Sequence, residues 1–449
     1  MILFALASAF VSVASAEGKE KVLYSFQGGA SDGQYPAGGV VFDKAGNLYG
    51  ATTDGGGECP PAQCGIVFQL APAAKMGDPW TETVLHIFQG PGSDDGNTPA
   101  GSLIIDSAGN LYGTTGYGGT GNCILLGTKV GCGTVYELSP PTQEGGAWTE
   151  TVLYSFPTPK QGYLPNGNLV FDSAGNLYGA TMFGGGEGTT CDSYYQYCGA
   201  VFELSPPKKQ GGAWTEKVLH GFAGIETGKQ EGDGANPNGG LALDSEGGIY
   251  GTTYTGGFDC AHHSGQGCGT AFKLTPPTKK GTRSESILHR FKAAPDGAGP
   301  AAGLAFDRQG NLYGTTVFAG VGNSASGTVF ELGLNADSSW TEQVLYTFQE
   351  GNDGAQPRGS VLLNTEGEIY GTASIAGAGE AGAIFRLRED AGNPWTFTVI
   401  YDFTRSPDGF YPTGPLIFGA ASKMYGTTQE GGDGQSCQPG CGTVFATMP

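Results

Sequence analysis

The stretch SLIIDSAGNLYGTT, residues 102–115, decides the fold, because copies of it recur along the whole 449-residue chain. Its central block GNLYG, or a variant of it, occurs seven times. Such a repeat predicts one body built from similar units, not the two or three domains that length alone suggests. The tyrosine of the block stands at Tyr49, Tyr112, Tyr178, Tyr250, Tyr313, Tyr370 and Tyr425.

Each tyrosine is accompanied by three further blocks in constant order. In the second copy they are SLIID at 102–106, GTVYEL at 133–138 and TETVLYSF at 149–156. The blocks have strand length and are rich in β-branched and aromatic residues, whereas Gly, Pro, Asn and Asp separate them. No helical periodicity is present. We therefore predict an all-β fold, a seven-bladed β-propeller of four-stranded antiparallel blades.

The two ends of the sequence predict how the ring closes. A fourth-strand block stands at 21–26, and the sequence finishes with a third-strand block at 442–447. The seventh repeat therefore lacks a fourth strand, and we expect the N-terminal strand to complete the last blade. Closure of this kind removes the open strand edges that a ring of sheets would expose to aggregation.

The N-terminal run MILFALASAFVSVASA, residues 1–16, is apolar and ends in a small-x-small motif, so we interpret it as a signal peptide, although a basic start is missing. Residues 17–449 are assigned to a single propeller. Its repeats are expected near residues 21–80, 81–148, 149–214, 215–282, 283–340, 341–395 and 396–449.

The formal net charge of −20 restricts the partners. Nucleic acid and anionic membranes need a basic face, and no later stretch is long and apolar enough for a membrane span, so we expect neither. Cations, neutral sugars and basic proteins remain compatible with this charge. A plainer alternative is that the charge keeps a Gly-rich secreted protein soluble. We expect a monomer, secreted to the extracellular space or held at the cell surface.

Two recurring features are interpreted as structural. The motif D-x-x-G-N, as in residues 106–110, is typical of a hairpin turn and is preferred over a metal-binding loop. His86, His220 and His289 share one position of the fourth strand with tyrosines of other repeats. Equivalent positions of separate blades lie far apart, so these histidines are not expected to bind one metal ion together.

The repeated combination VLYSF, DxxGNLYGTT, GG and GTVFEL extends along essentially the whole chain after residue 16 and resembles the GloVer tandem-repeat family of secreted bacterial proteins. The resemblance implies a β-propeller-like repeat protein and supplies no catalytic residues. Members of that family carry varied C-terminal surface anchors. This sequence finishes directly after its last strand, at Pro449, which leaves attachment to a cell surface open.

Ten cysteines form five local pairs, each in the loop between the second and third strands of a repeat. The fifth and sixth repeats lack both members, as expected if the two cysteines of a pair are disulfide partners. The pattern favours an oxidising compartment and argues against a metal site, because two thiols do not complete a tetrahedral centre. The pairs are Cys59 with Cys64, Cys123 with Cys132, Cys191 with Cys198, Cys260 with Cys268, and Cys437 with Cys441.

The loop before the innermost strand carries the motif D-G-x-x-P in six repeats, with Gln161 in place of the aspartate in the third. If these loops reach the axis, the carboxylates form a ring at the channel mouth that binds Ca²⁺ or attracts a basic or hydroxylated ligand. Calcium is a possible cofactor, with Asp95 and Asp296 as candidate ligands. Ordinary turn chemistry is the alternative. The aspartates are Asp32, Asp95, Asp233, Asp296, Asp353 and Asp408.

Aromatic residues gather in the loops of the same face. Flat apolar rings with a polar tip suit sugars or protein partners. The loops that carry a cysteine pair, called stapled loops from here on, also need a small core of their own, which is the alternative role for these rings. His262 and His263 lie there too and are weak metal or acid–base candidates. The tyrosines singled out for ligand binding are Tyr117, Tyr194, Tyr195, Tyr197, Tyr254 and Tyr411.

The leading functional hypothesis is a non-enzymatic, secreted binding or scaffold propeller that requires no cofactor. Its ligand, a carbohydrate or a surface protein, is expected on the face of the stapled loops. One alternative is an extracellular enzyme of lyase, lactonase or glycosidase type with carboxylates at the channel mouth. Another is a structural envelope or matrix protein. Catalytic sites need unlike residues at one place, and the candidate acids recur in nearly every repeat, which favours binding.

Overall fold

The structure is a computed structural model. It describes residues 20–59, 62–73, 75, 79–90, 93–125, 127–143, 145–185, 198–209, 211–225, 232–258, 260, 267–277, 283–318, 326–390 and 395–449.

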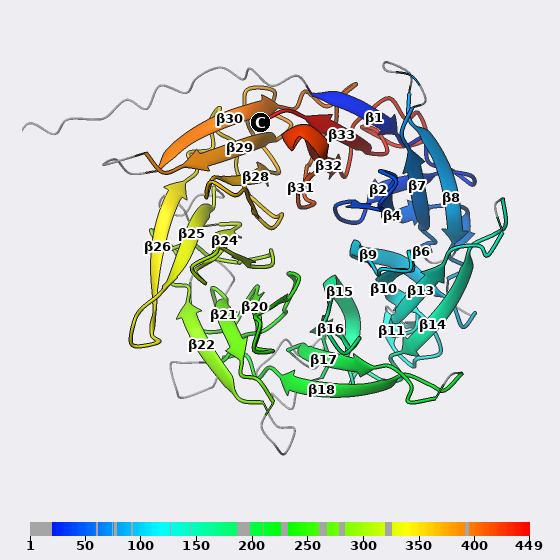
Figure 1. Ribbon diagram of the computed structural model, residues 1–449, viewed down its shortest axis with the longest axis horizontal. Helices are drawn as coiled ribbons and strands as arrows, with labels where there is room; N and C mark the ends of the chain where they lie inside the picture. The colour runs from blue at the N-terminus through cyan, green and yellow to red at the C-terminus, as the bar shows by residue number, and fades with distance from the viewer. Residues whose placement is uncertain are drawn as a thin grey trace, which may run out of the picture.

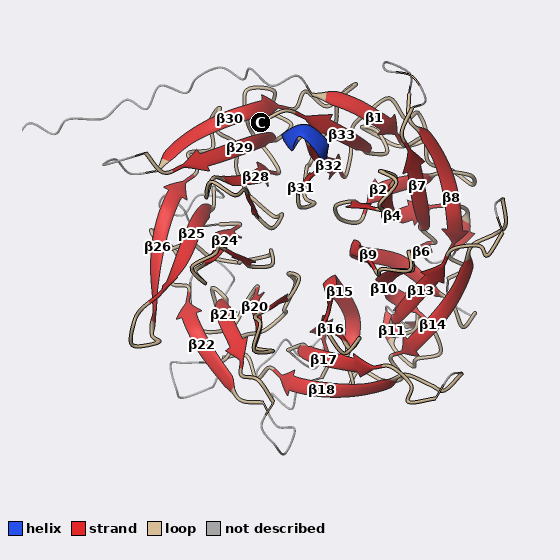
Figure 2. Ribbon diagram, in the orientation of Figure 1, coloured by secondary structure: helices blue, strands red, loops and turns tan. Residues whose placement is uncertain are grey.

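Seven antiparallel sheets surround a central axis, and each runs from an inner strand near the axis to an outer strand at the rim (Figure 1). In the first blade the inner strand is divided into β2 and β3, which both pair with β4. Figure 2 shows one short helical turn among the strands, and in the described part of the chain it is the 3-10 turn η2 (Ala420–Ser422). The predicted fold class is confirmed.

The inner strands are β2 (Gly33–Pro36) with β3 (Val41–Phe42), β9 (Gly96–Ile105), β15 (Tyr163–Phe171), β19 (Ala242–Leu243), β23 (Ala305–Phe306), β27 (Leu362–Leu363) and β31 (Ile417–Phe418). The second strands are β4 (Leu48–Gly55), β10 (Leu111–Gly118), β16 (Leu177–Phe183), β20 (Ile249–Thr253), β24 (Leu312–Thr316), β28 (Ile369–Ala373) and β32 (Met424–Thr428).

The third strands are β7 (Ile66–Ala71), β13 (Thr134–Ser139), β17 (Ala200–Ser205), β21 (Thr270–Leu274), β25 (Thr328–Leu334), β29 (Ala383–Arg388) and β33 (Thr443–Thr447). The outer strands are β8 (Thr81–Ile87), β14 (Thr149–Ser155), β18 (Thr215–Gly221), β22 (Glu285–Arg290), β26 (Trp340–Thr347), β30 (Thr396–Asp402) and β1 (Lys21–Ser25). Two loops carry small hairpins, β5 (Glu58–Cys59) with β6 (Ala62–Gln63) and β11 (Ile124–Leu125) with β12 (Thr128–Lys129).

The core of the molecule lies between neighbouring blades. Phe156, just after outer strand β14, is fully buried and packs edge-on against Phe202 of the third blade, with ring centroids 5.2 Å apart. A Cβ atom added to Gly179 would lie 2.6 Å from Cζ of Phe202. The glycine of the repeated LYG block therefore makes room for an aromatic ring of the adjacent strand.

The D-x-x-G-N motif forms the predicted hairpin turn. Oδ1 of Asp43 accepts the backbone N–H groups of Ala45 and Asn47, at 2.8 and 2.9 Å. Its Oδ2 accepts the side-chain amide of Asn47 and the hydroxyl of Tyr49, at 2.7 and 3.1 Å. The turn carboxylate is thus bonded to the tyrosine that marks each repeat, which explains why aspartate and tyrosine recur together.

The N-terminal strand completes the seventh blade, as predicted. β1 pairs antiparallel with β33, with Lys21 opposite Ala446 and Ser25 opposite Thr443. In Figure 1 the blue first strand lies beside the red last strand. The ring is therefore closed by hydrogen bonds between the two ends of the described chain.

Disulfides connect Cys123 with Cys132, Cys260 with Cys268 and Cys437 with Cys441, which confirms three of the predicted pairs. Cys64 and Cys198 are also disulfide-bonded. The side chain of Cys59 and all of Cys191 lie outside the described residues, as does the predicted signal peptide at 1–16. A search of the described helices finds none with the length and apolarity of a membrane span.

Candidate functional site

A cavity of about 310 Å³ opens on the propeller axis, where the inner strands begin. Each blade contributes a segment with the pattern P-x-G-x, or P-x-A-x in the fifth blade, which we call the entry segment. The cavity lies on the side of the stapled loops, because entry segments follow the loop from the outer strand of the preceding repeat. The entry segments are residues 36–39, 99–102, 165–168, 237–240, 300–303, 357–360 and 412–415.

Small residues allow the entry segments to touch one another around the axis. A Cβ atom on Gly38 would lie 2.6 Å from the carbonyl carbon of Gly101, and one on Gly101 would lie 2.6 Å from the carbonyl oxygen of Gly167. Threonines of the second strands hold these backbones in place, since Thr427 Oγ1 donates to the carbonyl of Gly38 at 2.7 Å. The cavity wall is therefore largely main chain, with a few projecting side chains.

The residue before the entry proline has a left-handed backbone in all seven blades, with φ between 54° and 66°. Its N–H donates to a carbonyl of the preceding blade, for example from Asn236 to Cys198 at 2.7 Å and from Gln356 to Ser326 at 3.0 Å. In five blades the acceptor is the second cysteine of a stapled loop. The cysteine loops thus position the channel mouth. The residues are Tyr35, Thr98, Leu164, Asn236, Gly299, Gln356 and Tyr411.

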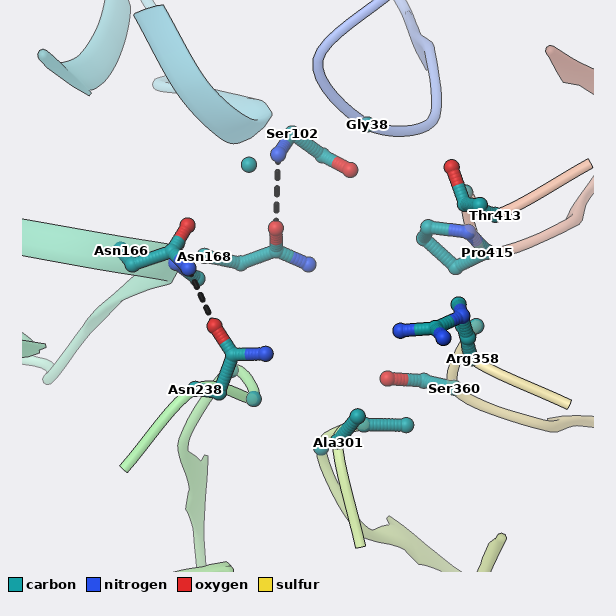
Figure 3. A pocket seen from close by; sticks show the side chains of 18 of the residues that line it. Gly38, Ser102, Asn166, Asn168, Asn238, Ala301, Arg358, Ser360, Thr413 and Pro415 are labelled. Atoms are coloured by element: carbon teal, nitrogen blue, oxygen red, sulfur yellow. Dashed lines mark hydrogen bonds between the residues drawn. The ribbon is translucent and has the colours of Figure 1, made fainter. Parts of the chain in front are cut away.

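Asparagine side chains form one wall of the cavity (Figure 3). The backbone N–H of Ser102 donates to Oδ1 of Asn168 at 2.7 Å, and Nδ2 of Asn166 donates to Oδ1 of Asn238. Oδ1 of Asn166 in turn accepts the N–H of Gly167 at 2.9 Å. Each of the three amide oxygens therefore already accepts a hydrogen bond from within the protein, and in Figure 3 the amide nitrogens of Asn168 and Asn238 face the open centre.

Arg358 occupies the opposite wall, beside Ser360, Thr413 and Pro415 (Figure 3). Its Nη2 donates to Oε1 of Gln356 at 3.0 Å, and its guanidinium lies 6.0 Å from the centroid of the Tyr411 ring. Burial raises the pKa of the Tyr254 hydroxyl, and the charge of the adjacent Arg358 partly offsets that rise. Nε of Arg358 is buried and has no hydrogen-bond partner in the described structure.

The electrostatics of the cavity differ from those of the whole chain. The net charge of the protein is −20, yet Arg358 is the one charged side chain among the described lining residues. No carboxylate of the described ranges lies within ion-pair distance of it. The channel mouth therefore presents an uncompensated positive charge together with amide and hydroxyl groups.

The predicted ring of six carboxylates does not line this cavity. Asp95 instead accepts hydrogen bonds from Nε2 of His86, the N–H of Gln89 and the N–H of Gly96, at 3.2, 3.0 and 2.7 Å. The reason is that the aspartate closes the loop after the outer strand and turns toward that strand, away from the axis. The other pairs with the outer strand are Asp32 with Tyr24, Asp233 with His220, Asp296 with His289, Asp353 with Tyr346, and Asp408 with Tyr401.

A glutamate of the following outer strand joins these pairs and makes a junction between blades. Nε2 of His220 lies 3.3 Å from Asp233 and 3.6 Å from Glu285, which belongs to the next outer strand along the rim. Burial, partly offset by the charge of His220, raises the pKa of Glu285 to about 7. Burial and the nearby charge of Asp95 likewise raise the pKa of Glu150 to about 7.

Two of these junctions have the composition of a metal site. His220, Asp233 and Glu285 bring three ligand atoms within 4.8 Å of one another, as do His289, Asp296 and Glu342. Tyrosine replaces the histidine in four blades and makes the same bond to aspartate in three of them, which favours a packing role for the cluster. Asp95 and Asp296 lie in different blades and accept backbone N–H groups, so a shared calcium ion finds no support.

The predicted tyrosines have three different outcomes. Tyr411 lines the cavity and Tyr254 lies beside Arg358, so both belong to the channel mouth. Tyr117 packs against Tyr163, with ring centroids 6.1 Å apart. Tyr194, Tyr195 and Tyr197, together with His262 and His263, lie outside the described residues.

Sequence reasoning missed the side chains that give the cavity its chemistry, namely Asn166, Asn168, Asn238 and Arg358. A signal was present, since the first and third positions after the entry proline change from blade to blade, while the proline and the small residue between them stay nearly constant. The predicted ring relied on aspartates that recur in most repeats. The residues at these variable positions were therefore missed, although they line one shared cavity.

A profile of the Gloeobacter/Verrucomicrobia repeat matches residues 7–262, 127–339 and 260–449. The chain belongs to this repeat family. Among curated proteins no significant match is found. The family membership agrees with the resemblance drawn from the repeated blocks.

Solved structures resemble this chain only distantly. A candidate 6-phosphogluconolactonase of Bacteroides uniformis is 15% identical, with a TM-score of 0.47, over 80% of this chain and 84% of that chain. The calcium structure of a Trichoderma reesei protein of Carbohydrate-Active Enzymes Family AA12 is 11% identical, with a TM-score of 0.44, over 97% and 96%. At this distance neither likeness informs the chemistry of the cavity.

Proposed function

We propose that the protein is an extracellular, non-catalytic binding propeller whose ligand is a small polar molecule, or the end of a glycan, held at the channel mouth. The observation that carries the proposal is the cavity of about 310 Å³ where a seven-fold backbone presents unlike polar side chains. This volume is at the small end of ligand sites, which span roughly 300–1,000 Å³. Polar groups that converge on a rigid scaffold are typical of a binding site.

The extracellular part of the proposal is supported by the disulfides and by the sequence of residues 1–16. Disulfides persist in oxidising compartments, and the described cysteines include no free thiol. Each stapled loop also anchors the entry segment of the next blade through its second cysteine. The loops that need an oxidising environment are therefore the ones that shape the binding cavity.

Binding is favoured over the lyase, lactonase and glycosidase alternatives by the composition of the wall. The described residues that line the cavity include no Asp, Glu, His, Lys or Cys. General acid–base catalysis by a carboxylate or a histidine, the groups used most often, needs such a side chain within reach of the substrate. Asn, Ser, Thr and Arg side chains suit recognition by hydrogen bonds.

The test is equilibrium binding of purified full-length protein to a panel of soluble oligosaccharides and cell-wall fragments, followed by chromatography of each ligand after incubation. We expect saturable binding, loss of at least about tenfold in affinity in Asn168→Ala/Asn238→Ala, and ligands of unchanged length. Asn335→Ala, in an exposed turn, is the matched control. Shortened ligands would favour the enzyme alternative, and no saturable ligand would favour a structural envelope protein.

A further inference from the structure

We propose that the ligand of the channel mouth is a hydroxylated carboxylate of the sugar-acid class, a uronate or an aldonate, with its carboxylate on Arg358. The inference rests on the proposed function and specifies the chemistry of the same site. It follows from three features of the cavity: a guanidinium without a carboxylate partner, amide N–H groups that face the centre, and the lack of carboxylates among the described lining residues.

The guanidinium of Arg358, which has no ion-pair partner among the described residues, is the first feature. Arg358 donates a hydrogen bond to Oε1 of Gln356 and also interacts with the hydroxyl of Tyr254, while its buried Nε–H has no acceptor in the described structure. A buried donor without a partner destabilises the folded protein by about 1–3 kcal/mol, and more when it is charged. A carboxylate suits such a guanidinium, because its two oxygens accept from the planar fork in charge-assisted bonds.

The second feature is that the opposite wall offers donors. The oxygens of Asn166, Asn168 and Asn238 already accept hydrogen bonds from within the protein. The amide nitrogens of Asn168 and Asn238 face the centre of the cavity. A ligand with several acceptor oxygens can therefore bond to both walls. Sugar acids meet this requirement, with a carboxylate at one side and hydroxyl oxygens at the other.

The net charge of −20 opposes the approach of an anion, but this effect is mostly long-range. At physiological salt the Debye length is about 8 Å, so distant surface carboxylates are largely screened inside the cavity. The predicted ring of carboxylates would have excluded an anion, and those aspartates bond to the outer strands instead. The local charge at the mouth is that of Arg358.

The experiment is titration calorimetry of full-length protein with D-galacturonate and D-gluconate, each paired with its neutral counterpart, D-galactose or D-glucose. We expect saturable binding of at least one acid and at least about tenfold weaker binding of its neutral counterpart. Arg358→Gln should weaken acid binding at least about tenfold. Lys44→Gln removes the same charge from an exposed turn and should leave binding unchanged.

Three results would overturn the inference: no acid binds, galactose binds as tightly as galacturonate, or Arg358→Gln retains the affinity of the wild type. A neutral glycan whose binding is lost in Asn168→Ala/Asn238→Ala but kept in Arg358→Gln would leave the proposed function standing without its anionic ligand. Ligand binding that neither variant changes would overturn both, since the ligand would then lie elsewhere.

Discussion

The residue directly after the entry proline differs between blades, and it gives an otherwise repetitive backbone its polar side chains. This position is alanine in three blades, asparagine in two, arginine in the sixth and threonine in the seventh. The backbone around it is fixed by a left-handed residue, by glycine contacts and by hydrogen bonds to the preceding blade. Substitution here therefore changes the ligand chemistry with little effect on the frame.

A second residue-scale prediction concerns the glycine of the LYG block. Gly179→Ala places a Cβ atom 2.6 Å from Cζ of Phe202, and we expect it to destabilise the protein by about 1–3 kcal/mol through overpacking. Gly333→Ala is the control, because its nearest neighbour lies at 3.8 Å. The measurement is denaturant unfolding of both variants. Equal stabilities would show that the blade spacing adjusts to the added methyl group.

The glutamates of the blade junctions predict a pH dependence. Burial raises the folded-state pKa of Glu150 and Glu342 to about 7, above the value of about 4.3 in an unfolded chain. The folded state therefore binds more protons between these values. Stability from this source is fully present below about pH 4 and is lost as pH rises through 7.

We accordingly expect the melting temperature to fall as pH is raised from about 5 to 8. Glu150→Gln mimics the protonated glutamate and should flatten this dependence. Glu246→Gln, at an exposed turn, should leave it unchanged. A wild-type melting temperature that rises over the same interval would contradict the junction chemistry.

At the scale of elements, the stapled loop and the entry segment act as one unit. The loop closed by Cys123 and Cys132 presents the carbonyl of Cys132 to Leu164, at 3.3 Å. The fifth and sixth blades offer the same carbonyl from Ser326 and Ala381 without a disulfide. The disulfide therefore stabilises a loop whose position the main chain already determines.

Replacing both cysteines of this loop by serine should destabilise the protein by about 2–3 kcal/mol, the value for a short closed loop, while the blade remains folded. Unfolding by denaturant and far-ultraviolet circular dichroism measure the two effects. Ser107→Ala, at an exposed turn of the same blade, is the control and should leave both measurements unchanged. Loss of the β signal in the cysteine variant would show that the disulfide determines the loop conformation.

The strands could be predicted from the sequence because their blocks recur, and recurrence averages out local ambiguity. Recurrence does not predict the direction in which a loop side chain points, because that direction depends on a partner elsewhere in the fold. The D-G-x-x-P motif was visible, but the partner that decides its orientation, His86 for Asp95 or Tyr346 for Asp353, stands on the outer strand. Arginine follows the entry proline in one repeat only, at Arg358. Its role in binding depends on the side chains of other blades that line the same cavity.

At the scale of the whole molecule, closure depends on the pairing of β1 with β33. A chain that begins at residue 27 lacks β1 and should expose the edge of β33 and the apolar side chains around Leu23 and Phe26, which are buried in the intact ring. We expect it to aggregate on size-exclusion chromatography. A chain that begins at residue 20 retains β1 and should remain monodisperse.

The same pairing has a consequence for the order of events during biosynthesis. Residues 21–25 emerge before the other strands of the ring, and their partners, residues 443–447, are made after all of them. Until then β1 lacks its partner strand. The ring therefore stays unclosed while the middle blades fold. The interval between the first and last strands is therefore the time of greatest exposure to proteases and misassembly, and shortening it by permuting the termini into an exposed turn should speed maturation.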